Sequence, residues 1–256
     1  MDLICDFISP DGHWLAFYTG YAGEWGQENQ QGPFDLTLNL LDLTTGEKQV
    51  VTPMLSKDYP NNFVEIAKTS KDSYPSAELI QAAFLGGITS AIAWSPDSHY
   101  LAFAAQIDGL SSDLYVYDMS QGNIRRLTDG IEQMQWIQWS SDGKWILHGS
   151  VYAMGEGVTD SIYAVTPDGK ALRSLSIGHF GGWFDDHTYF EYDSQNGPGN
   201  YGLRAVDINT GSMTKIWDSS FLGYQVDLAF NYLVVSTLEE GLLTCCFEHI
   251  RCNGRI

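Results

Sequence analysis

Residues 94–103 read Trp-Ser-Pro-Asp-Ser-His-Tyr-Leu-Ala-Phe, and residues 139–148 read Trp-Ser-Ser-Asp-Gly-Lys-Trp-Ile-Leu-His. In both stretches a tight turn rich in serine and aspartate is followed by an apolar run of strand length. The tryptophan that opens each stretch recurs at Trp183, so the repeat has a period of 44 to 45 residues. That period is typical of the four-stranded blades of a β-propeller.

Each unit predicts four antiparallel strands. The apolar strand is followed by a second strand that ends in a glycine turn, as at 117–122, and by a short final strand, as at 125–128. Glycine reaches positive φ at low cost and aspartate caps its own backbone, which explains their place in these turns. Aligning the apolar strands places these residues in one column: Trp14, Tyr100, Trp145, Tyr189 and Tyr232. We therefore predict an all-β fold, a β-propeller of four-stranded antiparallel blades with five blades visible.

The Ser-Pro-Asp-Gly turn at 9–12, the Leu-Ala-Phe strand at 101–103 and the Tyr-Val-Tyr-Asp to Arg-Arg-Leu-Thr segment at 115–128 resemble the WD40-like (PD40) repeats of TolB-type β-propellers. The resemblance covers most of the chain and is strongest over 90–176. Such propellers often have six blades, so the five units would then belong to a six-bladed ring. The resemblance implies a bacterial or archaeal extracytoplasmic protein, periplasmic or secreted, whose ligand is a protein, a peptide or a cell-surface polymer.

A repeat buries its faces against its neighbours, so we expect residues 1–256 to form a single propeller domain. The segment 53–88 is longer than a plain connection, and Ser76–Leu85 has the spacing of a short amphipathic helix that Gly86 and Gly87 would end. The sequence shows no transmembrane run and no signal peptide. The last residues do not resemble a completed blade, so the chain is either whole or a fragment of a longer protein.

The charge balance narrows the range of partners. The chain has 13 basic and 32 acidic residues, a formal net charge of −19, which repels phosphate backbones and anionic membranes. We expect a protein, peptide or carbohydrate ligand, no nucleic acid and no membrane span. The oligomeric state stays open.

Four cysteines lie near the two ends of the sequence: Cys5, Cys245, Cys246 and Cys252. A bridge from Cys5 to one of the other three would join the first and last blades in an oxidising compartment. Free thiols are the alternative. The sequence contains no Cys-x-x-Cys pair and no helical metal motif, so we expect no metal and no cofactor.

The long connections should all lie at one face, because antiparallel strands alternate the ends at which their turns emerge. We expect them at 18–34, 53–88, 104–112, 149–160 and 193–200. Aromatic rings stack on sugars or cations and carboxylates accept hydrogen bonds. The candidate ligand-binding residues of these loops are Tyr21, Glu24, Trp25, Tyr59, Tyr152 and Glu156. The alternative is that the rings pack the loops and the acids are solvated.

Two polar residues interrupt otherwise apolar columns. His148 takes the position of Phe17 and Phe103, while Glu191 takes the position of Ala16 and its equivalents. Polar groups are costly to bury without partners, so both residues are further ligand-binding candidates. Satisfied structural hydrogen bonding is the alternative explanation.

The function predicted from these features is that of a non-catalytic binding or interaction module. No nucleophile elbow, metalloprotease helix, phosphate loop or dinucleotide fingerprint is present, so no catalytic residue is assigned. One alternative is a glycoside hydrolase or lyase with paired carboxylates in the propeller channel. Another is the propeller portion of a prolyl-oligopeptidase-type peptidase.

Overall fold

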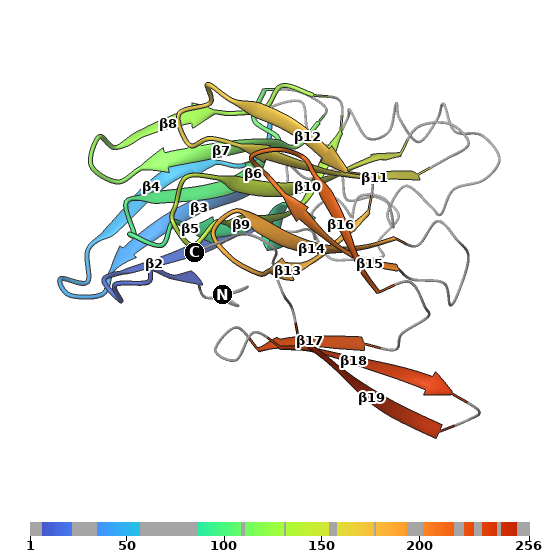
Figure 1. Ribbon diagram of the computed structural model, residues 1–256. Helices are drawn as coiled ribbons and strands as arrows, with labels where there is room; N and C mark the ends of the chain where they lie inside the picture. Colours follow the sequence, from blue (N-terminus) through green and yellow to red (C-terminus); the bar gives the residue numbers. More distant parts are fainter. Residues whose placement is uncertain are drawn as a thin grey trace, which may run out of the picture. The chain divides into compact units, whose positions relative to one another are not determined.

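The computed structural model in Figure 1 shows an almost wholly β-stranded chain. It describes residues 7–21, 35–56, 87–108, 111–130, 132–153, 158–176, 178–193, 202–217, 223–227, 232–239 and 242–249. The chain divides into two compact units, Met1–Ser174 and Leu175–Ile256.

Three four-stranded sheets follow one another up to residue 176. The first contains β1 (Phe7–Ile8), β2 (Trp14–Tyr21), β3 (Asp35–Asp42) and β4 (Lys48–Pro53). The second contains β5 (Ile92–Trp94), β6 (Tyr100–Ala105), β7 (Asp113–Asp118) and β8 (Asn123–Arg126). The third contains β9 (Gln133–Trp139), β10 (Ile146–Ala153), β11 (Val158–Val165) and β12 (Leu172–Ser176). In each sheet the strands pair antiparallel in chain order, as the repeat predicts.

Two more sheets follow. The fourth contains β13 (His179–Trp183), β14 (Thr188–Asp193), β15 (Gly202–Asp207) and β16 (Met213–Trp217). The fifth has three strands, β17 (Gly223–Asp227), β18 (Tyr232–Glu239) and β19 (Leu242–His249). Five successive antiparallel meanders confirm the predicted all-β, propeller-type fold, and the fifth lacks a fourth strand among the described residues.

A serine and an aspartate build the turn between the first two strands of a sheet. Ser95 donates from Oγ to Oδ1 of Asp97 at 2.6 Å and accepts the backbone N–H of Tyr100 at 2.9 Å. Ser140 makes the same pair of bonds, to Asp142 at 2.8 Å and from the next strand at 3.0 Å. The fourth residue of these turns has a positive φ. Among the described residues other than glycine, Ser98, with a φ of 62°, is the one that has a positive φ. The local chemistry of the repeat therefore fixes the hairpin.

The register of the fourth sheet corrects one predicted column. Thr188 pairs with Asp207 as Trp14 pairs with Asp42, so Thr188 and not Tyr189 occupies the first position of its strand. The cause is a turn one residue shorter, since Phe184 N donates to the carbonyl of Thr188 four residues later, whereas the other sheets bridge five residues. Glu191 therefore does not replace an alanine. It takes the position of Phe17, Phe103 and His148 in the other sheets. The cross-strand pairs show this correspondence: Phe17 with Asn39, Phe103 with Tyr115, His148 with Tyr163, and Glu191 with Arg204.

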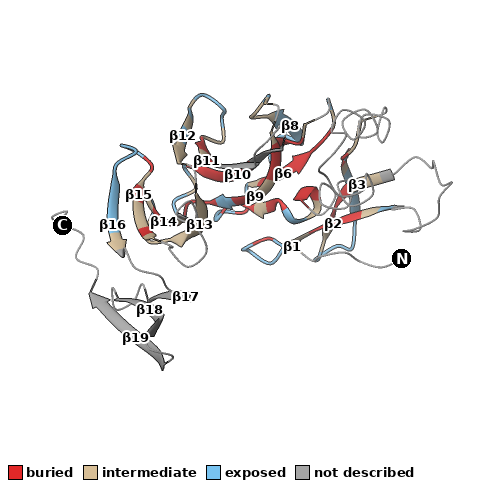
Figure 2. Cartoon of the chain, turned by 90° about the vertical axis from the view of Figure 1, so that its right-hand side faces the viewer, coloured by how far each residue is buried: buried red, intermediate tan, exposed pale blue. Residues whose placement is uncertain are grey.

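The core lies between neighbouring sheets. Strands β6 and β7 are buried along almost their whole length, whereas β8 is largely exposed (Figure 2). Two indoles also connect neighbouring sheets, because Nε1 of Trp94 donates to the carbonyl of Phe7 and Nε1 of Trp139 donates to that of Ala93, both at 3.0 Å. The apolar faces therefore pack in a fixed order along the chain.

Several predicted segment boundaries change. The β2–β3 hairpin continues to Tyr21 and the β10–β11 hairpin runs to Ala153 and Val158, so Tyr21 and Tyr152 lie in strands rather than in loops. These hairpins extend because their backbones keep pairing beyond the shorter outer strands. Residues 87–90 form a helical turn that includes Gly87. The sequence predicted instead that Gly87 would end a helix. The predicted helix itself, Ser76–Leu85, lies outside the described residues.

The predictions about the chain ends stay predictions. Cys245 and Cys246 lie in β19, whereas Cys5 and Cys252 lie outside the described residues. Among the described residues, no helix has the length and apolar character needed to cross a membrane.

Candidate ligand-binding site

Four predicted ligand-binding residues, Glu24, Trp25, Tyr59 and Glu156, lie outside the described residues, so their roles stay predictions. Tyr21 and Tyr152 are placed by their backbone alone, at the ends of β2 and β10. The two residues singled out by column analysis, His148 and Glu191, are both described in full. They lie in different compact units and are treated separately.

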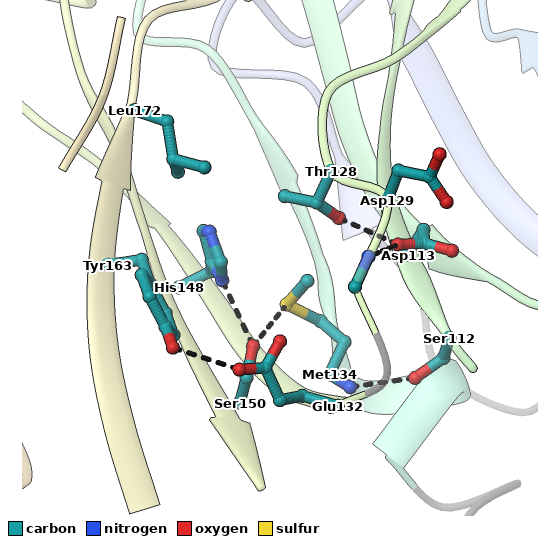
Figure 3. A pocket seen from close by; sticks show the side chains of 11 residues that line it. Ser112, Asp113, Thr128, Asp129, Glu132, Met134, His148, Ser150, Tyr163 and Leu172 are labelled. Carbon is teal, nitrogen blue, oxygen red and sulfur yellow. Dashed lines mark hydrogen bonds between the residues drawn. The ribbon is translucent and has the colours of Figure 1, made fainter. Parts of the chain in front are cut away.

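A cavity of about 110 Å³ lies in the first unit, at the junction of the second and third sheets (Figure 3). Strands β7, β9, β10, β11 and β12 contribute to it, together with the connection that joins β8 to β9. The residues that line it are Ser112, Asp113, Thr128, Asp129, Gly130, Glu132, Met134, His148, Ser150, Tyr163 and Leu172. One predicted site residue, His148, is among them.

The His148 ring is almost fully buried, with 2% of its surface exposed. Its Nδ1 lies 3.3 Å from Oγ of Ser150, and the ring stacks on Tyr163 with centroids 5.3 Å apart. Burial lowers the pKa of His148 to about 3, so the imidazole is neutral at physiological pH. Its Nε2 has no hydrogen-bond partner among the described residues. Figure 3 shows that nitrogen on the side of the ring away from Ser150, toward Leu172.

Tyr163 is the cross-strand partner of His148 and also anchors a carboxylate. Its hydroxyl donates to Oε1 of Glu132 at 2.9 Å, as Figure 3 shows. Burial and the bond to Glu132 raise the pKa of Tyr163, so the phenol stays protonated and donates. Tyr163 therefore stacks one ring face on a neutral imidazole and orients a carboxylate with its hydroxyl.

Asp113 holds the opposite wall of the cavity. Its Oδ1 accepts hydrogen bonds from Thr128 Oγ1 at 3.0 Å and from Gly130 N at 3.2 Å. Its Oδ2 accepts a hydrogen bond from Nη2 of Arg126 at 2.6 Å. The same guanidinium nitrogen lies 2.8 Å from Oδ1 of Asp129. Charge-assisted bonds of this kind are strong, so the connection after β8 has a defined course along the cavity.

Backbone contacts join the two sheets at this cavity. Met134 N donates to Oγ of Ser112 at 2.7 Å, and Ser112 N donates to Oε1 of Gln133 at 3.0 Å. Ser112 and Gln133 also form an isolated parallel bridge. The cavity therefore lies where these strands meet the connection from β8 to β9, and two of its residues, Ser112 and Ser150, fall in the segments 104–112 and 149–160 that the sequence predicted as long connections.

Glu191 has a different environment in the second unit. It is fully buried, and its Oε1 lies 3.2 Å from Nε of Arg204, its cross-strand partner. Burial, and to a lesser extent the Glu191 carboxylate, raise the pKa of neighbouring Tyr189. The ion pair gives Glu191 a charged partner, but neither carboxylate oxygen has a hydrogen-bond partner among the described residues, so its role in ligand binding stays a prediction.

Sequence reasoning missed most residues of the cavity. Tyr163 could have been found, because a hairpin register that pairs Trp145 with Thr166 places Tyr163 opposite His148. Glu132 and Asp113 carry no such signal, since an acid before a strand and an acid at the start of a strand are common. Their role depends on contacts made after folding.

Comparisons with solved structures agree with the fold. Dipeptidyl peptidase 4 of Porphyromonas gingivalis matches with a TM-score of 0.60 and 14% identity, over 96% of this chain and 39% of that one. An oligogalacturonate lyase, solved in complex with manganese, matches with a TM-score of 0.56 and 14% identity, over 97% of this chain and 65% of the lyase chain. TolB from Acinetobacter baumannii is 18% identical over 97% and 52%, with a TM-score of 0.48 that is too low to argue from.

No family model matches the sequence, and no curated protein matches it either. The chain spans between about two fifths and two thirds of the length of the solved structures above. At these identities the likeness concerns the fold alone, and the fold is a β-propeller type that peptidases and a lyase share.

Proposed function

We propose that this protein is a non-catalytic binding module, and that its ligand places a small polar group in the cavity beside His148. The observation that supports this most directly is Nε2 of His148, a buried nitrogen of a cavity-lining residue that has no hydrogen-bond partner among the described residues. Buried polar atoms are costly unless they are hydrogen-bonded. A ligand group that enters the cavity would supply the missing bond.

The cavity chemistry argues against catalysis at this position. Ser150 and His148 are 3.3 Å apart, which resembles a nucleophile beside a general base. A useful general base has a pKa near the working pH, whereas the pKa of His148 is lowered to about 3. Ser150 is itself buried, and its hydroxyl also lies 4.0 Å from the sulfur of Met134. The pair is therefore suited to holding a ligand and unsuited to deprotonating a serine.

We propose that the ligand is part of a protein, a peptide or a cell-surface polymer, and that the protein works outside the cytoplasm of a bacterium. The resemblance of the repeats to TolB-type propellers supports both statements. Fractionation of the native source, with this chain detected by antibody, tests the compartment. Recovery in the cytoplasmic fraction would contradict it.

The binding proposal is tested with a ligand panel and one variant. Wild type and His148→Phe are titrated calorimetrically with a lysine-rich peptide, an acidic peptide and neutral oligosaccharides. Phenylalanine occupies this column in two other sheets, so the variant should fold while filling the cavity. We expect one ligand class to bind wild type and to lose at least tenfold in affinity in the variant. Equal affinity for both proteins would place the binding site elsewhere.

The second candidate function is the propeller portion of a prolyl-oligopeptidase-type peptidase. The extent of one structural match favours it. The match to a prolyl endopeptidase covers 96% of this chain but 33% of the peptidase chain, with a TM-score of 0.57 and 14% identity. A fluorophosphonate, which labels activated serines, tests it on the native protein. A labelled product that is longer than this chain and contains its sequence would support the peptidase, and an unlabelled product would contradict it.

A further inference from the structure

We propose that the cavity beside His148 recognises an alkylammonium group, such as that of a lysine side chain, and that Glu132 is the carboxylate that binds it. This inference rests on the proposed binding function and specifies its ligand. It is supported by the charge of the cavity, by the hydrogen-bond and ion-pair partners of its polar atoms, and by its size.

The charges at the cavity favour a cation. Asp113, Asp129 and Glu132 line it, and Arg126 is the cation that contacts this wall. The guanidinium lies 2.6 Å from Asp113 and 2.8 Å from Asp129, so its charge is shared between them. No lysine or arginine is among the lining residues. An anionic ligand would be repelled and a cation attracted.

Glu132 differs from the two aspartates. It forms no ion pair with any described residue, and its one described hydrogen bond comes from the Tyr163 hydroxyl to Oε1. A phenol orients a carboxylate but leaves its negative charge uncompensated. Glu132 is thus a fixed, negatively charged acceptor at the edge of the cavity, which an ammonium group would neutralise.

The buried imidazole supplies a second acceptor. Ser150 Oγ lies between Nδ1 of His148 and the sulfur of Met134, at 3.3 and 4.0 Å. If the hydroxyl donates to the sulfur, Nδ1 carries the ring proton and donates to Ser150. Nε2 then offers a lone pair, because a neutral imidazole has one donor and one acceptor. An ammonium has three donors and no acceptor, so each of these two acceptors suits it.

The size of the cavity agrees with such a group. A volume of about 110 Å³ corresponds to roughly three or four water-sized groups at about 30 Å³ each. That is the space of an ammonium with its first methylenes, and Leu172 and Met134 provide apolar contact for those methylenes. A whole sugar ring would stay largely outside. It would also find one face of the Tyr163 ring covered by His148.

The experiment uses three probes and two matched variants. Nα-acetyl-lysine N-methylamide, its norleucine counterpart without the ammonium, and spermidine are titrated into the full chain and followed by NMR. Glu132→Gln removes the charge at the cavity and retains the shape. Glu47→Gln makes the same change in an exposed turn, away from the cavity. Thermal unfolding of each variant establishes that it folds.

We expect the lysine derivative to bind wild type at least tenfold more tightly than the norleucine derivative. Glu132→Gln should weaken lysine binding at least tenfold, and Glu47→Gln should change it less than twofold. Tyr163→Phe, which keeps the charge but removes the bond that orients Glu132, should lose an intermediate amount. Spermidine that binds with the same dependence on Glu132 while the lysine derivative does not would identify a polyamine as the source of the ammonium.

The two proposals fail in different ways. Equal binding of lysine and norleucine derivatives, or unchanged lysine binding in Glu132→Gln, would overturn the ammonium inference. If an oligosaccharide binds instead and its affinity falls in His148→Phe, the binding module stands and the ammonium inference is wrong. If no ligand distinguishes wild type from His148→Phe, both proposals fail.

Discussion

Replacing His148 by phenylalanine should stabilise the protein, and the gain should grow as the solution becomes acidic. The residue is 2% exposed and its Nε2 has no described partner. An unsatisfied buried polar group costs about 1–3 kcal/mol, so His148→Phe should gain about that amount at pH 7, offset by any strain from the larger ring. The neighbouring cavity gives that ring room to adjust.

The pH dependence follows from the lowered pKa of His148. Its ordinary pKa is 6.5 and its folded value is about 3, so the unfolded chain takes up the proton first. The stability that the neutral ring retains is present above pH 6.5 and is lost as the pH falls toward 3. One proton changes the free energy of unfolding by about 1.4 kcal/mol per pH unit. Between pH 6.5 and 4.5 wild type should therefore lose about 2.3 kcal/mol relative to the variant, because the unfolded histidine is already half protonated at pH 6.5.

The assay is urea unfolding of both proteins at pH 7.0, 5.5 and 4.5, followed by tryptophan fluorescence. The charged and polar groups that face the cavity, Asp113, Asp129, Glu132 and Tyr163, are the same in both proteins, so their contributions largely cancel in the difference. An NMR titration of the His148 ring measures its pKa directly. A constant difference in stability across the three pH values, or a pKa near 6.5, would refute the reasoning.

Three further substitutions test the packing and the hydrogen bonds. Gly149→Ala should destabilise the protein by about 1–3 kcal/mol, measured by thermal unfolding, because its Cβ would collide with the indole ring of Trp136. Ser95→Ala should cost about 1–2 kcal/mol in urea unfolding, since the hydroxyl makes two turn hydrogen bonds; an unchanged midpoint would contradict that role. Arg204→Tyr should cost about 3–5 kcal/mol by leaving Glu191 buried without its cation, and Glu191→Phe added to it should recover most of that loss. If the double variant is no more stable than the single one, the ion pair is not the cause.

The turns and the strand order could be predicted from the sequence because their causes are local. In the turn between the first two strands, a serine two residues before an aspartate closes the same hairpin, as Ser95 and Ser140 show. The meander then follows from the spacing alone. The fourth sheet resisted the same reasoning because its turn is one residue shorter, which the hydrogen bond from Phe184 to Thr188 shows and the sequence does not.

The site could be predicted in part for a related reason. His148 stood out because its equivalents are phenylalanines, and that contrast is visible without any structure. Glu132 became part of the site through its bond to Tyr163, which depends on the path of the connection after β8. The prediction that aromatic loop residues bind ligand rested on composition alone. Backbone pairing places two of them, Tyr21 and Tyr152, in strands rather than in loops.

The indole bonds between sheets have a consequence for how freely this sequence can diverge. Trp94 and Trp139 donate to backbone carbonyls, at Phe7 and Ala93. A carbonyl is present whatever side chain the residue carries, so the preceding sheet can exchange almost every amino acid and still receive the bond. The second and third sheets therefore each take their alignment from one tryptophan of their own, whatever side chains the preceding sheet carries.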